Sequence, residues 1–301
     1  MQRRLFIKNT GLTLGALAFL NTDSLAGFLA DPAYNIKMLT PEIGIFTEKG
    51  GTILFMLNKK GIVVVDSQFP DSAAHLIDEL KKKSTKPFNL LINTHHHGDH
   101  SGGNIAFKGL VENVIAHANS KINQQASAAK DKTEAKQLFP DVTYTDTWEK
   151  KFKRERIKMH YFGAGHTNGD SLVHFQESNI IHMGDLVFNR RHPYIDKTAG
   201  ADIANWIKVL EKTTSTFSNG TTYVCGHAAT GYDVVLKSSD LLAFRDYLGN
   251  LLKYTDEQIK AGKTRDEILK STTIPGSPEW KGNGIERGLT AAYSELTMNL
   301  K

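Results

Sequence analysis

A run of histidines directly after a short apolar segment is the feature that most constrains this chain. Four of its 12 histidines lie within the six positions 95–100, together with one carboxylate. The apolar run 88–93 that precedes them is short and well bounded, which is typical of a buried strand. Because alternate side chains of an extended segment point the same way, His95 and His97 should converge on one point.

The rest of this run points to a second cluster beside the first. Gly98 permits a turn that brings Asp99 and His100 to a neighbouring point. Imidazole and carboxylate together suit zinc, manganese or iron. The alternative is a solvated histidine-rich loop, but such loops seldom end a buried strand. The sequence therefore predicts one half of a two-metal site.

Candidates for the other half occur as a glycine followed by a potential ligand. Each pair ends a strand-like segment, and the pairs are Gly165-His166, Gly184-Asp185 and Gly226-His227. A glycine lets the backbone turn sharply and approach a metal without a Cβ clash. One such pair alone is weak, but five histidines and two carboxylates at strand ends are a strong combined signal.

These residues and their spacing resemble the metallo-β-lactamase superfamily of dinuclear metallohydrolases. The pattern H-x-H-x-D-H falls on residues 95–100, and every further ligand position of the family is filled. The resemblance implies that His95, His97 and His166 hold one metal. It implies that Asp99, His100 and His227 hold the other, with Asp185 between the two. His96 falls at a position that the motif leaves free.

One departure from the β-lactamases bears on the substrate. Several true β-lactamases have a cysteine or serine where this chain has Asp185. The aspartate is similar to that of glyoxalase II, lactonases, phosphodiesterases and uncharacterised exported relatives. Cys225 lies two residues before His227 and not at a ligand position. Hydrolysis of β-lactams is therefore an alternative and not the default expectation.

Such a site predicts a hydrolase. Two divalent ions carry four positive charges, and Asp99, Asp185 and a bridging hydroxide remove three, which leaves a positive field for a developing oxyanion. We expect an exported, dinuclear zinc-dependent hydrolase in which metal-bound hydroxide attacks a small ester, lactone, thioester, amide or phosphoester. Asp99 is the candidate catalytic residue that orients the nucleophile or moves a proton. Neither a G-x-S-x-G elbow nor a Walker loop competes with this reading.

Two other function classes stay open at this point. Some members of the resembled superfamily hold a single iron through two histidines and the aspartate and oxidise persulfides. The filled second ligand set argues against that chemistry. The other alternative is a metal-binding protein without turnover. Zinc is the expected cofactor, two ions per chain, with iron or manganese as substitutes.

The sequence indicates less strongly which residues around the ligands support them or contact the substrate. In the resembled family an aspartate at the position of Asp66 supports the histidine loop, and metal-bound imidazoles need such an acceptor. Thr94 and Thr167 could bond ligand or backbone groups. Arg190 and Tyr194 follow the Asp185 segment, where relatives often place residues that contact the substrate. The alternatives are turn formers and an ordinary solvated loop.

The first residues predict where the enzyme works. Residues 2–8 resemble the twin-arginine export motif, and an apolar stretch over 11–20 follows, which is too short to span a bilayer. Small residues up to Ala26 predict cleavage after it, so residues 1–26 are the expected signal peptide and the site is periplasmic or secreted. The alternative is an uncleaved anchor.

Charge and cysteine content limit the partners. The net charge is +5 for the whole chain, and the predicted signal peptide accounts for two of these charges. The lysine clusters at 81–83 and 150–154 have acidic neighbours and no aromatic platform, so we expect a small-molecule substrate and no nucleic acid. One cysteine precludes an intramolecular disulfide. No pattern specifies the oligomeric state, and no stable membrane span is expected after cleavage.

Strand and helix signals alternate along one expected domain, residues 27–301, with helices at its C-terminal end. Hairpins are predicted over 52–66 and 171–183. Helices are predicted over 70–84, 118–138, 201–217, 238–262 and 283–299. Two sheets with helices outside make an α/β, four-layer αββα sandwich, which is also the metallo-β-lactamase-type fold that the resemblance implies.

Overall fold

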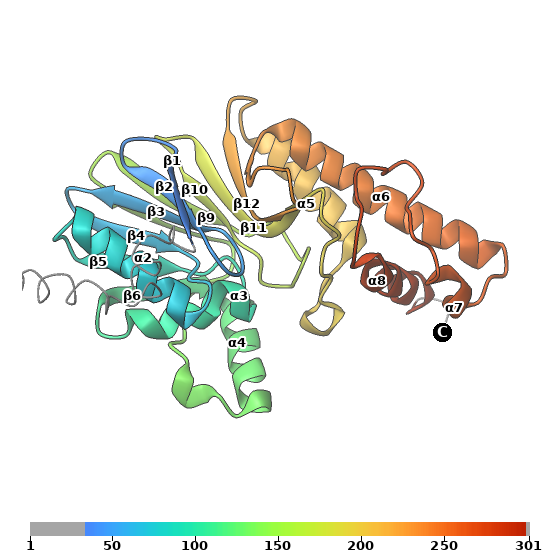
Figure 1. Cartoon of the computed structure of the whole chain (residues 1–301), viewed down its shortest axis with the longest axis horizontal. Coiled ribbons are helices and arrows are strands. Elements are labelled where there is room, and N and C mark those ends of the chain that lie inside the picture. Colours follow the sequence, from blue (N-terminus) through green and yellow to red (C-terminus); the bar gives the residue numbers. More distant parts are fainter. Residues whose placement is uncertain (1–33, 299–301) are drawn as a thin grey trace, which may run out of the picture. The chain divides into compact units, whose positions relative to one another are not determined.

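The structure contains two β-sheets, whose strands are the arrows in Figure 1. These strands hold most of the buried apolar side chains of the described residues. The computed structural model describes residues 34–298, so the predicted signal peptide, residues 1–26, lies outside the described residues. For the same reason the predicted domain bounds, 27–301, stay a prediction. Within the described residues no helix is both long and apolar enough to cross a bilayer.

The first sheet has seven strands in sequential order: β1 (Asn35–Met38), β2 (Ile43–Thr47), β3 (Ile53–Asn58), β4 (Gly61–Val65), β5 (Phe88–Ile92), β6 (Val111–His117) and β7 (Val142–Tyr144). The strands from β2 to β4 are antiparallel, and those from β4 to β7 are parallel. The parallel strands alternate with helices α2 (Pro70–Lys83) and α4 (Ala118–Asp131), as parallel connections require.

The second sheet has six strands in the order β13-β12-β11-β10-β9-β8. Their bounds are β8 (Thr147–Phe152), β9 (Glu155–His160), β10 (Leu172–Phe175), β11 (Ile180–Asn189), β12 (Thr222–Ala228) and β13 (Val235–Leu236). Only β11 and β12 pair in parallel. Helix α5 (Ile203–Thr216) makes the crossover between them.

The two sheets pack face to face because alternate residues of each strand are apolar. Leu54, Val63 and Ile92 of the first sheet share one buried cluster with Met159, Val173 and Val224 of the second. The intervening residues of the first sheet, such as Phe55 and Val64, are also fully buried. Because successive side chains of a strand point to opposite faces, these residues face away from the second sheet.

A second apolar cluster joins the outer face of the second sheet to the C-terminal helices. Trp206 of α5, Phe244 of α6 (Ser238–Lys260) and Leu289 of α8 (Ile285–Met298) pack with Met183 and Tyr223 of the sheet. The short helix α7 (Arg265–Ile268) lies between α6 and α8 in sequence. The predicted four-layer αββα sandwich is confirmed.

Two details differ from the sequence-based expectation. Helix α4 ends at Asp131 because Lys132 adopts the left-handed conformation, and a short 3-10 turn, Glu134–Lys136, follows it. Strand β11 continues to Asn189, so Asp185 lies inside a strand and not at its end. The pairing with β12 shifts register on both sides of Gly184, which interrupts the strand where the ligand stands.

Hydrogen bonds join the two sheets at the edge where the predicted ligands gather. The amide of Thr52 donates to the carbonyl of Gly226 at 2.9 Å, and the ring of His182 bonds the carbonyl of Thr52 at 2.8 Å. The amide of Ser171 donates to the carbonyl of Thr94 at 2.8 Å. These contacts fix the loops of one sheet against the other.

Two neighbouring histidines lie on the outer face of the second sheet: His174 is buried and His160 is half-buried, and Nε2 of His160 has no hydrogen-bond partner among the described residues. The rings of His160 and His174 lie 6.0 Å apart, and both contact Phe217, where α5 ends. Among the described residues, neither nitrogen of His174 has a hydrogen-bond partner. Burial lowers the pKa of both imidazoles to about 4, and the charge of Lys158 acts in the same direction.

These histidines should make the fold sensitive to acid. Their pKa is near 6.5 in the unfolded chain, so between about pH 6.5 and 4 the unfolded chain binds protons that the folded chain does not. The free energy of unfolding should therefore fall as the pH falls through this window. Denaturant unfolding at about pH 7 and about pH 4.5 measures this loss of unfolding free energy. Between these two pH values the His174→Leu variant should lose about 1–2 kcal/mol less than the original chain, a figure reduced to allow for the partial exposure of the ring. Equal losses in the two proteins would contradict this assignment.

Candidate metal centre

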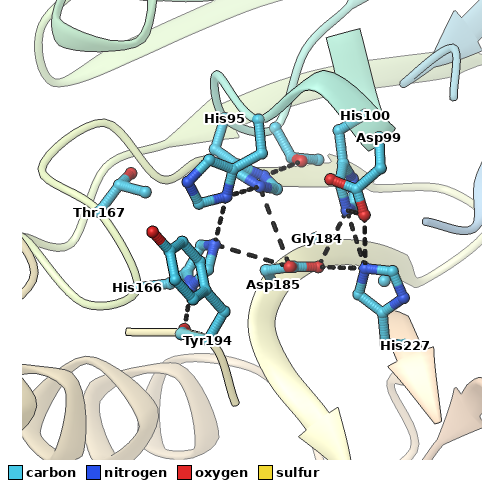
Figure 2. A network of polar contacts seen from close by, with 12 residues as sticks. His95, Asp99, His100, His166, Thr167, Gly184, Asp185, Tyr194 and His227 are labelled. Atoms are coloured by element: carbon cyan, nitrogen blue, oxygen red, sulfur yellow. Dashed lines mark hydrogen bonds and ion pairs between the residues drawn. The ribbon is translucent and has the colours of Figure 1, made fainter. Parts of the chain in front are cut away.

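The seven predicted ligands meet at the edge of the sandwich, from both sheets (Figure 2). The loop after β5 and the short helix α3 (Gly98–Ser101) carry four of them: His95, His97, Asp99 and His100. The second sheet supplies the others. His166 lies in the loop between β9 and β10, Asp185 lies in β11, and His227 lies in β12.

The first group consists of His95, His97, His166 and Asp185. The Nδ1 atom of His97 lies 3.1 Å from Nε2 of His95 and 2.8 Å from Nε2 of His166. The Oδ2 atom of Asp185 lies 3.6 Å from Nε2 of His166 and 4.0 Å from Nε2 of His95. Four potential donor atoms thus surround one small volume.

The second group consists of Asp99, His100 and His227. The Nε2 atom of His227 lies 3.1 Å from Oδ2 of Asp99 and 3.3 Å from Nε2 of His100. The other oxygen of Asp185, Oδ1, lies 3.0 Å from Nε2 of His100 and 3.6 Å from Nε2 of His227. Asp185 therefore turns one oxygen to each group (Figure 2).

The close spacing of these donor atoms is favourable with a metal ion between them and unfavourable without one. Imidazole nitrogens that carry lone pairs repel at these distances unless a cation or a proton lies between them. The Oδ1 atom of Asp185 is buried and has no hydrogen-bond partner among the described residues. Imidazole nitrogens and carboxylate oxygens are also the ligands that zinc and related transition metals take. Both groups can hold a metal ion.

The opposite nitrogens of the first group have acceptors, which leaves the converging nitrogens unprotonated. Nδ1 of His166 donates to the backbone carbonyl of Tyr194 at 2.7 Å, and Nε2 of His97 bonds Oδ2 of Asp196 at 3.0 Å. Nδ1 of His95 lies 3.0 Å from the hydroxyl of Thr94. Metal-binding imidazoles typically have such partners, which fix the ring and its tautomer.

Asp66 connects both groups from behind. It is fully buried and accepts hydrogen bonds from the amide and the hydroxyl of Thr94, each at 2.8 Å. Its Oδ2 atom also lies 2.8 Å from Nδ1 of His100. Since the hydroxyl proton of Thr94 goes to Asp66, the hydroxyl oxygen accepts from His95. The carboxylate thereby contacts His100 directly and His95 through Thr94, one histidine of each group.

Glycine is required beside two of the ligands. Gly184 has φ +49°, and a Cβ atom there would overlap the hydroxyl of Thr94. A Cβ atom at Gly226 would overlap Oδ1 of Asp185 and lie 2.9 Å from the ring of His100. The glycines that precede Asp185 and His227 in sequence therefore let the second sheet approach the histidine loop of the first sheet.

The charge states of three buried ligands, His95, His166 and Asp185, suit metal binding. Burial holds the pKa of His95 well below its usual value and lowers the pKa of His166 to about 3, so both rings are neutral bases. Burial opposes the ionisation of Asp185, but the neighbouring rings of His227 and His100 hold the pKa of its carboxyl well below the usual range. A neutral imidazole and an ionised carboxylate are the states that bind metals.

Asp196 is a contributor that sequence reasoning missed. Its side chain is buried and accepts hydrogen bonds from the amides of Thr198 and Ala199, at 3.1 and 3.0 Å, besides its contact with His97. These bonds and those to the imidazoles lower the pKa of its carboxyl, although burial acts against them. No spacing rule points to it, because it lies in an irregular segment that folds back onto the ligand loop.

His96 lies apart from both ligand groups. Its Nε2 atom is 3.5 Å from Oδ2 of Asp196, on the far side of His97, and its Nδ1 atom has no hydrogen-bond partner among the described residues. It forms a separate potential metal-binding set with His97 and Asp196. His96 is in neither of the two groups that share Asp185, and its place outside the two-metal site stays a prediction.

The weaker candidates occupy different places. Tyr194 lies against His97, with ring centres 5.3 Å apart, and the residue is 43% exposed. Arg190 instead bonds Asp240 and Glu279 at 3.3 and 3.1 Å, away from the ligands. Thr167 donates hydrogen bonds to Asp170 from both its amide and its hydroxyl, at 2.8 and 2.6 Å. The substrate contacts predicted for Arg190 and Tyr194 stay predictions.

A cavity of about 340 Å³ opens onto both ligand groups. Its metal-facing wall is formed by His97, Asp99, Asp185 and His227, and its other wall by Phe188, Arg191, His192, Tyr194 and Arg287. Pockets of this size hold small molecules. A small substrate can therefore reach both groups at once.

Several known proteins resemble this chain in sequence. It is 27% identical over 218 residues to metallo-beta-lactamase type 2 of Bacillus sp. (strain 170), which covers 69% of this chain and 82% of the relative. It is 23% identical over 199 residues to metallo-beta-lactamase IND-1 of Chryseobacterium indologenes, covering 65% of this chain and 80% of the relative.

Solved structures share the fold. A metallo-beta-lactamase from Pontibacter korlensis superposes with a TM-score of 0.61 at 20% identity, over 72% of this chain and 99% of the other. The sec-alkylsulfatase Pisa1 from Pseudomonas sp. superposes with a TM-score of 0.69 at 13% identity, over 86% of this chain and 50% of the other. At these identities the likeness shows the fold alone.

The sequence pattern of the metallo-beta-lactamase superfamily matches residues 47–227, a range that holds every predicted ligand. That range is more than half of the chain, and the superposed structures have the same sandwich. The chain therefore belongs to the metallo-beta-lactamase superfamily and is a metal-dependent hydrolase.

Proposed function

We propose that the protein is a dinuclear zinc hydrolase that acts on a small ester, lactone, thioester, amide or phosphoester. One observation carries the proposal: the two oxygens of Asp185 face two separate groups of ligands, at 3.6 and 3.0 Å from the nearest imidazole nitrogens. A single ion needs only one such group. The complete second group also favours a hydrolase over a mononuclear iron oxidoreductase.

The preference for zinc follows from the donor atoms. Five imidazoles outnumber two carboxylates, and zinc takes such a mixture in catalytic sites, although iron and manganese accept it too. When bound, a pair of divalent ions lowers the pKa of water between them and polarises the oxygen of an electrophilic centre. The protein contributes the fixed ligand positions and the walls of the cavity.

Asp99 is the predicted ligand that can also accept and transfer a proton. Its side chain is 32% exposed, whereas that of Asp185 is 4% exposed. Burial opposes its ionisation, but the hydrogen bond with His227 and the charge of His100 keep the pKa of its carboxyl below the usual value. An ionised carboxylate on the cavity wall can accept a proton from an attacking water and pass it to a leaving group.

β-Lactam hydrolysis is the second candidate, because the relatives at 23–27% identity are named metallo-beta-lactamases. The reaction class is the same, since a β-lactam is a cyclic amide. Asp185 stands where, in the resembled family, several true β-lactamases have a cysteine or serine, so the general hydrolase remains the main proposal.

Export is proposed separately from the chemistry. Arg3 and Arg4 begin a twin-arginine-like segment, and small residues up to Ala26 suit a signal peptidase. A protein that takes up its metals before export would arrive with a complete site. We propose a periplasmic or secreted location on these grounds.

Metal analysis tests the proposed centre directly. The purified protein should contain about two zinc ions per chain, since seven ligands exceed the needs of one tetrahedral ion. Removal by a chelator should abolish hydrolysis in a screen of thioesters, lactones, phosphodiesters and a chromogenic cephalosporin, and added zinc should restore it. A single bound iron, with no hydrolysis restored by zinc, would overturn the proposal.

Two neighbouring histidines give a matched comparison. His97→Ala removes a nitrogen at the centre of the first group, so it should lose one ion and lower turnover by several orders of magnitude. His96→Ala removes a ring outside that group and should keep both ions and most of the activity. Bound zinc and hydrolysis rates measured on both variants decide the matter. If His96→Ala is as damaging as His97→Ala, the assigned ligand set is wrong.

Replacing Arg3 and Arg4 together by lysine tests export. Twin-arginine signals are recognised as an address, so the double variant should accumulate in the cytoplasm as uncleaved precursor. Cell fractionation followed by immunoblotting measures this distribution. Unchanged periplasmic protein would exclude twin-arginine export without bearing on the metal centre.

A further inference from the structure

Two arginines from different parts of the chain line the cavity that opens onto the metal ligands. Arg191 follows strand β11, and Arg287 lies in the first turn of α8. Arg287 lies outside residues 47–227, the range that matches the superfamily pattern. The cavity wall opposite the ligands is therefore built partly by a helix that the shared pattern does not include.

These arginines differ from their neighbour Arg190. The guanidinium of Arg190 forms ion pairs with Asp240 and Glu279, stacks over Trp280, and has a side chain only 13% exposed. By contrast, Arg191 and Arg287 are exposed, and neither forms an ion pair with any residue that the structure describes. Their charges remain available to a ligand.

Arg287 is close to the ligand groups. Its guanidinium carbon lies 5.9 Å from the ring centre of Tyr194, and the same ring lies 5.3 Å from the ring of His97. One aromatic side chain thus separates this cation from a predicted metal ligand. Arg191 lines this cavity and also a second cavity of about 810 Å³, so it lies between the two.

Charge and shape favour an anionic ligand here. Two uncompensated guanidinium groups face a cavity whose only acidic lining residues are Asp99 and Asp185, both predicted to bind metals. Guanidinium groups bind carboxylates and other oxyanions through paired hydrogen bonds, and they bind more strongly where water is partly excluded. A cationic substrate would be repelled by the arginines and the metals together.

We propose that Arg191 and Arg287 form a subsite for an anionic group of the substrate. This inference rests on the proposed function and narrows it: the substrate is a small anion whose scissile bond lies at the ligand groups and whose carboxylate, or a related oxyanion, lies at the arginines. The volume of about 340 Å³ limits the distance between these two parts to a few bonds.

Thiols of graded length test the subsite by binding, without any turnover. A thiolate binds zinc strongly, so the zinc-loaded protein should bind ω-mercaptoalcohols through the metals alone. Each alcohol has a matched ω-mercaptocarboxylate and ω-mercaptosulfonate of the same chain length. We expect at least one chain length at which an anionic thiol binds about tenfold or more tightly than the alcohol in calorimetric titration. The better anion identifies whether the subsite takes a planar carboxylate or a tetrahedral oxyanion.

Variants separate the arginines from the metals as the source of this preference. Arg287→Gln and Arg191→Gln should each reduce the advantage of the anionic thiol, and the double variant should abolish it, while the affinity for the alcohol stays unchanged. Arg287→Lys should restore part of the advantage because it restores the charge. Arg156→Gln, on the exposed face of β9 and paired with Glu149, is the matched control and should change neither affinity.

The outcomes distinguish this inference from the function on which it rests. If the double variant keeps the full preference, the anion binds the metals themselves and the subsite is wrong. If the alcohol and the anionic thiols bind equally to the original protein, the subsite is wrong while the metal centre stands. If none of the thiols binds the zinc-loaded protein, the proposed centre fails and the subsite fails with it.

Discussion

The structure depends on placing several ionisable groups in one buried volume at the edge where the two sheets meet. The first sheet supplies the ligands of segment 95–100, and the second supplies His166, Asp185 and His227. Burying such groups without compensation costs several kcal/mol each, whereas a divalent ion converts the same arrangement into a favourable one. Ions bound to these ligands would therefore connect the two sheets, in addition to the hydrogen bonds from Thr52 and Ser171 that already join them.

Asp66 shows how that arrangement is held before any ion binds. It follows β4 in the left-handed conformation, with φ 65°, and is fully buried. Its carboxylate fixes Thr94 and, through it, His95, while its second contact fixes His100 in the other group. One side chain from a neighbouring strand thus sets the orientation of imidazoles in both groups. Non-glycine residues seldom adopt this conformation, so the surrounding hydrogen bonds must stabilise it.

The sequence predicted those elements whose conformation depends on residues nearby in the chain. The apolar run before His95, the hairpin across 59–60 and helix α2 follow from periodicity and turn residues, and the structure places them as expected. The extension of β11 past Asp185 was not predicted, because it depends on pairing with β12 across a register shift. Asp196 was not predicted for a similar reason. It contacts His97 only because its loop folds back onto the ligand loop, and no neighbouring residue in the sequence indicates that contact. Arg190 and Arg191 are adjacent in the sequence and differ only in the partners that the fold gives them. Asp240 and Glu279 form ion pairs with Arg190, whereas Arg191 forms none with the described residues.

The chemistry and the choice of substrate thus have different origins in the chain. All seven predicted ligands fall within 47–227, the range shared with the superfamily, and they specify a reaction class without specifying a substrate. The cavity wall that faces them includes Arg287 from α8, whose position is set by apolar packing of Leu289 against the cluster around Tyr247 and Trp280. A helix packed in this way can change its exposed residues without disturbing the ligands. Substrate preference can therefore diverge along α8 while the metal centre stays the same, and for this reason relatives that share the ligands are a poor guide to the molecule this protein hydrolyses.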